Sequence, residues 1–314
     1  MEVLHSWNGA SYEKGLGGET NIKVEASIFV AIQRKGLKLT FDIGSMEGYD
    51  APGSVLLAEF SPEGIGLGLL EGRSRTMYRY TYATGDNKEG SLLPGILKAF
   101  PEYEGPFSQV AISYRFPSCV LVPSTLYRFQ EEGLFLQSAG ADIPGQVLRS
   151  DHLPSHSLQA VYGLPKSLNI AVTRQYLRHQ YWHQFAVFLK NAVPPSGSFL
   201  SVDIRPGDFA VSLYRDGQPE LLSIFPYASP ADVLYRLVHL SESFGLSRDT
   251  LPMEVSGFVD EGSSLFHEMR LYFAQITFPG KLETLRLAHA FEDHPAHYFS
   301  SLSKLAACVS YPEH

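Results

Sequence analysis

The chain contains two segments that share one pattern of acidic, turn and apolar residues. Residues 58 to 72 read AEFSPEGIGLGLLEG, and residues 202 to 217 read VDIRPGDFAVSLYRDG. With Leu56 aligned on Leu200, the match covers both segments and, with one residue skipped at Gly217, continues beyond them. The matched pairs include Glu59 with Asp203, Pro62 with Pro206, Leu69 with Leu213, and Tyr82-Ala83-Thr84 with Tyr227-Ala228-Ser229. This repeat predicts two copies of one supersecondary unit, although a generic hairpin could produce much of the same pattern.

Length and composition indicate a folded protein with more than one domain. The chain has 314 residues, more than a single hydrophobic core usually serves. Hydrophobic residues make up 44% and charged residues 18%, which is typical of globular proteins. The net charge of −8 argues against a surface that neutralises phosphates, so no nucleic-acid partner is predicted.

Cysteine usage and the absence of targeting signals predict a cytoplasmic protein. Only Cys119 and Cys308 occur, and both lie beside apolar residues, which favours buried reduced thiols and leaves a single bridge between them open. The first residues lack a basic segment followed by an apolar run, so no secretory signal is predicted. No apolar stretch approaches about 18 residues, so no membrane span is predicted either.

Turn-rich stretches divide the chain into three parts. Residues 22 to 43 alternate apolar and polar around Lys35-Gly36, which predicts a hairpin, and glycines and prolines then form a connector. The stretch AVPPSGS at 192 to 198 disfavours both helix and strand and is the best linker. We therefore predict an N-terminal hairpin and connector at 1 to 53, a first domain at 54 to 195 and a second domain at 196 to 314.

Within each half, the pattern predicts three antiparallel strands followed by alternating helices and strands. Ser229-Pro230-Ala231-Asp232 begins a helix that ends at Gly245. In the first half, LQAVYGLP at 158 to 165 reads as a strand, residues 136 to 157 as a loop, and residues 165 to 191 as one long helical stretch. This order predicts an α/β protein with mixed sheets and flanking helices.

Three longer runs resemble a known group of proteins. They are VAISYRFPSCVLVPSTLY, LLSIFPYASPADVLYRLVHLSESFGL and PAHYFSSLSKLAAC, and together with the repeat they span roughly residues 54 to 308. They look like an uncharacterised bacterial family of unknown function with an actin-like ATPase fold. The wider superfamily includes actin, sugar kinases and heat-shock chaperones. The resemblance implies two duplicated ribonuclease-H-like domains.

The resemblance also implies where a nucleotide site would lie. The superfamily holds Mg-ATP between its halves, with an acid and a glycine-rich turn from each hairpin and a glycine-rich turn at the adenosine. The positions that match are Glu59, Gly64, Asp203, Gly207 and Gly257. No separate metal site and no catalytic residue is predicted.

The sequence departs from the superfamily at each of these places. Pro62 removes one N–H donor from the first turn, Arg205 replaces an expected glycine, and Phe258 follows the lone Gly257. A salt bridge to surrounding acids is the favoured role of Arg205, with an anion contact as the alternative. The nucleotide site therefore reads as degraded, and no cofactor is expected, although Mg-ATP stays open as a ligand.

Other motifs are weaker candidates. Asp42-Ile43-Gly44 has the form of a phosphate motif but lacks the second strand that should follow it. His179 and His183 stand at a metal-ligand spacing, but partly exposed histidines are the favoured interpretation. We found no nucleophile elbow and no activated cysteine.

Two functions remain in competition at this stage. The preferred one is a binding or scaffolding protein with a protein partner, as in the actin-like proteins of pilus assembly. The rival is an active ATPase or small-molecule kinase that uses Glu59 and Asp203 to hold a metal ion. A nucleic-acid enzyme of ribonuclease-H type ranks last, because it needs several clustered carboxylates. The oligomeric state is left open.

Overall fold

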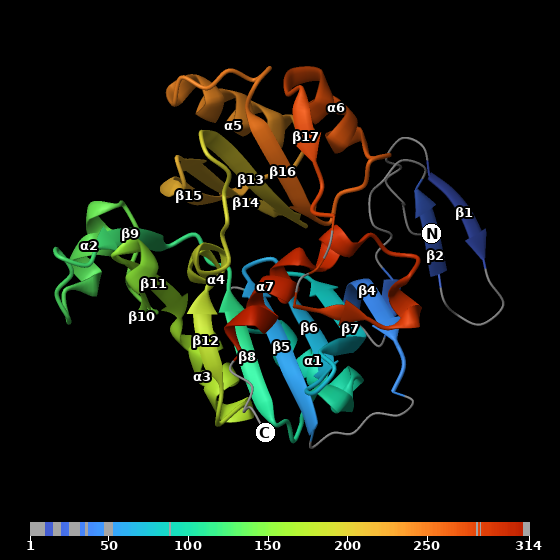
Figure 1. The fold of residues 1–314 in the computed structure, drawn as a ribbon. Coiled ribbons are helices and arrows are strands. Elements are labelled where there is room, and N and C mark those ends of the chain that lie inside the picture. Colours follow the sequence, from blue (N-terminus) through green and yellow to red (C-terminus); the bar gives the residue numbers. More distant parts are fainter. Residues whose placement is uncertain are drawn as a thin grey trace, which may run out of the picture.

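The computed structural model describes residues 10–14, 20–24, 32–34, 37–46, 53–87, 89–280, 282 and 284–309. Two large mixed sheets with flanking helices form most of the molecule (Figure 1). A small three-stranded sheet, with its helix α2, projects to one side of the first large sheet (Figure 1). The predicted α/β class with mixed sheets and flanking helices is confirmed.

The first large sheet has the strand order β12-β8-β5-β6-β7-β4-β3, and β18 pairs with β7. Strands β5, β6 and β7 form an antiparallel meander, while β8 runs parallel to β5 and β12 runs parallel to β8. Its strands are β3 (Ile32–Arg34), β4 (Leu37–Gly44), β5 (Ser54–Ser61), β6 (Gly64–Glu71), β7 (Thr76–Thr84), β8 (Gln109–Tyr114), β12 (Gln180–His183) and β18 (Arg286–Leu287).

The second large sheet repeats this order as β15-β14-β13-β16-β17. Its meander is again antiparallel, and β16 and β17 again run parallel beside the first strand of the meander. Its strands are β13 (Ser198–Arg205), β14 (Asp208–Arg215), β15 (Gln218–Pro226), β16 (Pro252–Gly257) and β17 (Gln275–Thr277). The two halves therefore share one topology, as the sequence repeat predicts.

Strand register tests the sequence alignment residue by residue. Glu59 lies opposite Gly66 in β6 and Ser113 in β8. Asp203 lies opposite Ala210 in β14 and Ser256 in β16. The two acids thus occupy equivalent positions, and the alignment of the first two strands is confirmed.

The alignment of the third strands is wrong. Thr84 pairs with Gly64, whereas the equivalent partner of Asp208 is Pro226, so Thr84 corresponds to Pro226 and not to Ser229. The reason is turn length. The turn between β6 and β7 is longer than the Asp216-Gly217 turn between β14 and β15. The alignment gap therefore belongs in the second segment, whereas skipping Gly217 places it in the first.

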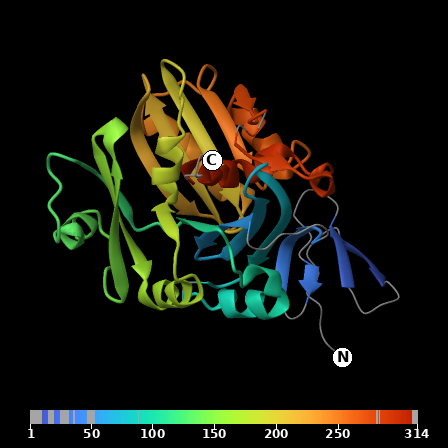
Figure 2. The ribbon, with the colours of Figure 1, turned by 60° about the horizontal axis from the view of Figure 1, so that its bottom comes forward.

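Helices cover both faces of the first sheet. On one face α1 (Leu92–Ala99) and α3 (Lys166–Gln175) pack on the alternate side chains of β5 and β6. On the other face α4 (Gln184–Lys190) and α7 (Ser300–Cys308) pack on the remaining ones. Helices α5 (Pro230–Ser243) and α6 (Ser264–Tyr272) cover one face of the second sheet. Helix α7 thus lies between the two large sheets (Figure 1 and Figure 2).

Two local predictions in the first half are wrong. The stretch 165 to 191 forms α3, β12 and α4 rather than one helix, because Gln180–His183 adds a parallel edge strand beside β8. The stretch 136 to 157 contains β10 (Gln146–Leu153) as well as loop. Strand β10 pairs with β11 (Leu158–Pro165), which pairs with β9 (Cys119–Pro123), and α2 (Glu132–Ser138) packs on this small sheet.

The ends of the chain extend the first sheet. The predicted hairpin is present as β3 and β4, whereas β2 (Thr20–Val24) pairs with β1 (Ala10–Lys14), and the Lys35-Gly36 turn lies outside the described residues. The predicted second domain at 196 to 314 includes β18 and α7, which pack with the first sheet. The chain therefore crosses between the halves twice, near residues 191–198 and near residues 278–285.

Candidate functional site

The turns of the two equivalent hairpins are in contact. Glu63 lies in the turn between β5 and β6, and Gly207 lies in the turn between β13 and β14. A Cβ atom added to Gly207 would lie 3.0 Å from Cγ of Glu63. The ends of the hairpins, where the sequence predicts a nucleotide site, are therefore packed against each other.

Asp203 lies at the centre of the polar groups behind these turns and is 1% exposed. Its Oδ2 accepts a hydrogen bond of 3.0 Å from Ser256 Oγ on the neighbouring strand. Its Oδ1 lies 2.6 Å from Nη1 of Arg115 and 3.4 Å from Nε of Arg205. Both carboxylate oxygens are thus bound by groups of the protein itself.

Arg115 reaches from the first half into the second. It follows β8 directly, and its backbone N–H donates to the carbonyl of Phe60 at 2.8 Å. Its side chain pairs with Asp203, donates to the Asp203 carbonyl at 2.9 Å, and places Nε 2.5 Å from Oδ1 of Asp208. This residue, 4% exposed, connects the two halves through three charge-assisted contacts.

Arg205 reaches in the opposite direction, from the second half toward the first. Its Nη2 lies 3.5 Å from Oε2 of Glu59 and also donates to Oγ of Ser301 in α7. Its guanidinium lies 4.3 Å from the centroid of the Phe258 ring, within range of a cation–π interaction. The predicted salt bridge between Arg205 and surrounding acids is confirmed. We call Glu59, Arg115, Asp203, Arg205 and Asp208 the ion-pair network.

Charge pairing overrides burial at Asp203 and Arg205, whereas at Asp208 burial outweighs the pairing with Arg115 and raises the pKa. Burial alone would raise the pKa of Asp203, but the positive charges of Arg205 and Arg115 outweigh it and hold that pKa below its ordinary value. Burial alone would lower the pKa of Arg205, but Asp203 and Glu59 raise it above its ordinary value. Asp203 and Arg205 are therefore both charged at neutral pH.

The three predicted site glycines are crowded by the backbone or by side chains of the chain itself. A Cβ atom on Gly257 would lie 2.1 Å from the carbonyl oxygen of Ile204, and the φ angle of +84° also favours glycine. A Cβ atom on Gly64 would lie 2.7 Å from the carbonyl oxygen of Ala83. Gly257 thus allows the end of β16 to approach β13 closely, which accounts for a glycine there without a nucleotide.

These residues do not fit a bound Mg-ATP. Mg²⁺ needs free carboxylate oxygens or waters held by them, and phosphates need backbone N–H groups in an open turn. Here both oxygens of Asp203 are bound, Arg205 occupies the place of a glycine, and Pro62 offers no N–H. The acids that match the superfamily are used for internal ion pairs.

Arg115 was missed in the sequence, although it belongs to one of the quoted runs. A signal was present in the repeat itself. The N–H of Arg115 bonds to Phe60 as the N–H of Phe258 bonds to Ile204, so Arg115 and Phe258 occupy equivalent positions. Extending the alignment to these strands would have singled out Arg115 as the charged residue at the position of Phe258, but not its pairing with Asp203.

The remaining candidates have structural roles. Asp42 forms an ion pair with Arg79, whose Nη1 also donates to the Gly44 carbonyl at 3.0 Å. His179 is partly exposed as predicted, whereas His183 is fully buried, which corrects the prediction of a partly exposed residue there. His183 caps α4 by accepting from the Phe185 N–H, and burial lowers its pKa to about 4. Within the described part of the chain, no group of three or more His, Cys, Asp or Glu residues could hold a metal ion.

The paired meanders and the strand order define an actin-like ATPase architecture. A Bacteroides thetaiotaomicron protein with an actin-like ATPase fold and unknown function is similar at a TM-score of 0.67 and 13% identity, over 82% of this chain and 97% of that one. The type IV pilus biogenesis complex of PilM and PilN contains a chain similar at a TM-score of 0.53 and 13% identity, over 81% of this chain and 97% of that one. At such identities the likeness shows the fold alone.

The family model of the protein of unknown function DUF3822 matches residues 50–276. The chain belongs to this family, and the resemblance stated from the sequence is confirmed. No curated protein matches the chain. Among the helices that the structure describes, none is long and apolar enough to cross a membrane.

Proposed function

We propose that this protein is a non-catalytic binding or scaffolding protein that keeps the actin-like fold without using ATP. One observation supports this most strongly. Arg115 and Arg205 bind the two acids, Asp203 and Glu59, that an active member would need for its metal ion.

Replacing these ion pairs by a nucleotide would be costly. A triphosphate with Mg²⁺ would have to separate Asp203 from both arginines, and the loss of one partner of a buried pair costs about 3–5 kcal/mol. The arginines would then pair with phosphate, but the Glu63–Gly207 contact would also have to open. The closed arrangement therefore favours a structural use of these charges.

A protein partner fits the surface of the small sheet. Three large apolar side chains on α2 and the segment before it are well exposed: Leu126, Phe129 and Leu134. Exposed apolar groups of this kind are common where proteins bind one another. The similar PilM chain is found in a complex with PilN, so a scaffold of this fold with a protein partner has a precedent.

Calorimetric titration with Mg-ATP tests the proposal. We expect no saturable heat, whereas a dissociation constant below about 1 mM would favour the ATPase or kinase function instead. If binding does occur, Asp203→Asn and Glu59→Gln should abolish it. Binding that is unchanged in both variants would place the nucleotide elsewhere in the molecule.

A further inference from the structure

A cavity of about 260 Å³ lies between the second sheet and the helices α4 and α7. Both crossings between the halves line it, the first at residues 191–194 and the second at Pro279, Leu282 and Thr284. Val193 on the first crossing is 94% exposed, so the cavity reaches the surface there. The cavity is separate from the ion-pair network, none of whose residues line it.

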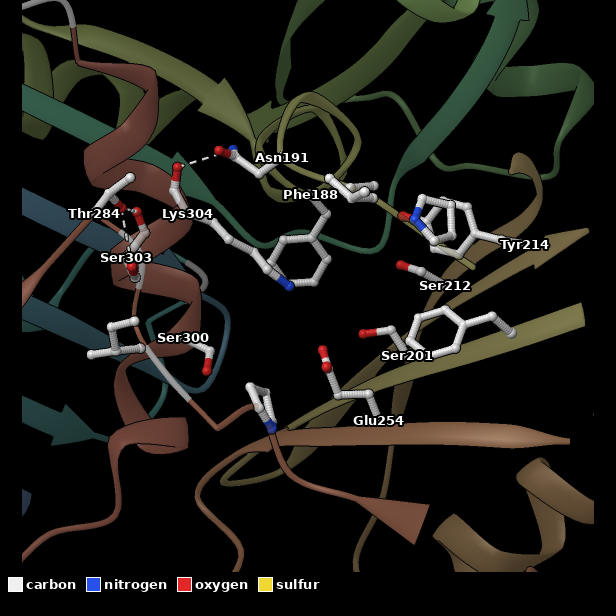
Figure 3. Close-up of a pocket in the computed structure, with 16 residues that line it drawn as sticks. Phe188, Asn191, Ser201, Ser212, Tyr214, Glu254, Thr284, Ser300, Ser303 and Lys304 are labelled. Carbon is white, nitrogen blue, oxygen red and sulfur yellow. Dashed lines mark hydrogen bonds between the residues drawn. The ribbon is translucent and has the colours of Figure 1, made fainter. Parts of the chain in front are cut away.

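Opposite charges face each other across this cavity without pairing. Lys304 extends into it from α7, and Glu254 points into it from β16 (Figure 3). Within the described residues, no carboxylate lies within 4.0 Å of the Lys304 ammonium and no cation lies within that distance of the Glu254 carboxylate. The ammonium instead lies 4.7 Å from the centroid of the Phe188 ring. Each charge is thus available to a ligand.

Hydroxyl groups and aromatic rings complete the walls. Ser201 and Ser212 point from the second sheet toward Lys304 (Figure 3). Ser300 of α7 is 4% exposed, and its Oγ has no hydrogen-bond partner in the described part of the protein. A buried hydroxyl without a partner costs free energy, and a polar ligand would remove this cost. The rings of Phe188, Phe199 and Tyr214 supply apolar contact around these polar groups.

We propose that this cavity binds a small zwitterion of the α-amino-acid class. The ligand carboxylate would pair with Lys304 and accept from the serine hydroxyls, while its ammonium group would pair with Glu254. A single ion would satisfy one of the two charges and leave the other unpaired. A zwitterion satisfies both at once.

The size of the cavity limits the ligand. Drug-sized ligands usually fill about 300–1,000 Å³, so 260 Å³ is suited to a smaller molecule than a nucleotide or a folded peptide segment. A ligand here would contact both crossings between the halves and so hold them in one relative position. This proposal does not rest on the absence of ATP binding, because the two sites share no residue.

A thermal-shift screen of the full chain against the individual proteinogenic amino acids, followed by calorimetry, tests the proposal. We expect at least one amino acid to bind and to raise Tm by about 3 °C at ten times its Kd. Lys304→Met and Glu254→Gln should each weaken that binding at least about tenfold, which corresponds to the loss of one charge-assisted contact. The same substitutions at exposed positions, Lys98→Met and Glu242→Gln, should leave it unchanged.

Three results would overturn the proposal. The first is that no amino acid binds at about 10 mM, ten times a Kd of about 1 mM. The second is binding that persists unchanged in both cavity variants. The third is that acetate or methylammonium alone binds as tightly as the amino acid. The last result would mean an adventitious ion only. A titration with Mg-ATP on the same sample reports on the proposed function separately, because the acid that it probes, Asp203, does not line the cavity.

Discussion

Two charged clusters lie between the halves of this protein, and they differ in how their charges are used. In the ion-pair network, Asp203 is paired with two arginines and bonded to Ser256. In the cavity, Lys304 and Glu254 face each other, and neither forms an ion pair with any residue that the structure describes. Helix α7 contributes to both, since Ser301 bonds to Arg205 and Lys304, one turn later, enters the cavity.

The difference shows how a fold can lose one site and offer another. Paired charges remove each other's capacity to bind a ligand, because a ligand must compete with a partner that is already in place. Unpaired charges at a cavity keep this capacity at the expense of some stability. Substitution should therefore cost much stability in the ion-pair network and little at the cavity.

Removing the central acid of the network should give the largest effect. Asp203→Ala leaves Arg115 and Arg205 buried with fewer partners, and we expect a loss of about 4 kcal/mol in the free energy of unfolding. Glu254→Ala in the cavity is the matched control, with an expected loss below about 1 kcal/mol. Chemical denaturation measures both. Equal losses in the two variants would contradict the distinction between the clusters.

The packing of β16 against β13 should be the next most sensitive feature. Gly257→Ala places a methyl group against the Ile204 carbonyl at a positive φ angle, and we expect a loss of about 3 kcal/mol. Gly245→Ala has a similar φ angle of +65° but nothing within 4 Å. Both substitutions include the cost of a positive φ angle, so the difference between the two losses measures the cost of crowding against Ile204. A loss at Gly257 no larger than that at Gly245 would contradict the assigned packing role.

The fold could be predicted because its signals are local and repeated. Alternating apolar residues and short turns fix the meanders, and Ser229 and Asp232 form the capping box that begins α5. The errors arose where tertiary contacts override local pattern. Residues 180–183 become a strand only because β8 offers an open edge beside them, and β10 forms only because β11 pairs with it.

The candidate site was predicted only in part. Glu59 and Asp203 were found from the repeat, and the pairing of Arg205 was expected from its acidic surroundings. Arg115 was not found, because its role depends on the approach of two sheets that are distant in sequence. The cavity was not found either, since its charged residues, Glu254 and Lys304, lie in a strand and a helix with no motif around them.

Acid titration can separate the network from two other buried groups, the imidazole of His183 and the carboxylate of Asp151, whose Oδ2 accepts a hydrogen bond of 2.6 Å from the His183 backbone N–H. The pKa of His183 is lowered to about 4, so its contribution to stability is lost as the pH falls below about 6.5. Burial raises the pKa of Asp151 to about 7, so its contribution changes in the opposite direction, and stability is gained as the pH falls below 7. The two effects therefore oppose each other in the wild type.

His183→Gln removes the contribution of His183 to the pH dependence of stability and leaves that of Asp151. Relative to the wild type, the variant should gain about 2 kcal/mol in unfolding free energy between pH 7 and pH 5. The contributions of Asp203 and Asp208 to the pH dependence are the same in both proteins and cancel when the two slopes are compared. Any pH-independent loss of stability from the α4 cap also cancels. Parallel slopes would mean that His183 does not stay neutral in the folded state.

The smallest effect is expected at Lys304, and it is the most direct test of the cavity. Lys304→Met keeps the aliphatic part of the side chain and removes the charge, which lies beside the ring of Phe188 and has no carboxylate within 4.0 Å in the described part of the chain. Such a contact is worth about 0.5–1 kcal/mol at most accessible sites, so the unfolding free energy should fall by less than about 1 kcal/mol. Lys98→Met on the surface of α1 is the control. A charge that is kept available for a ligand contributes little to stability until that ligand is bound. A loss above about 2 kcal/mol would therefore mean that Lys304 stabilises the fold as the arginines do.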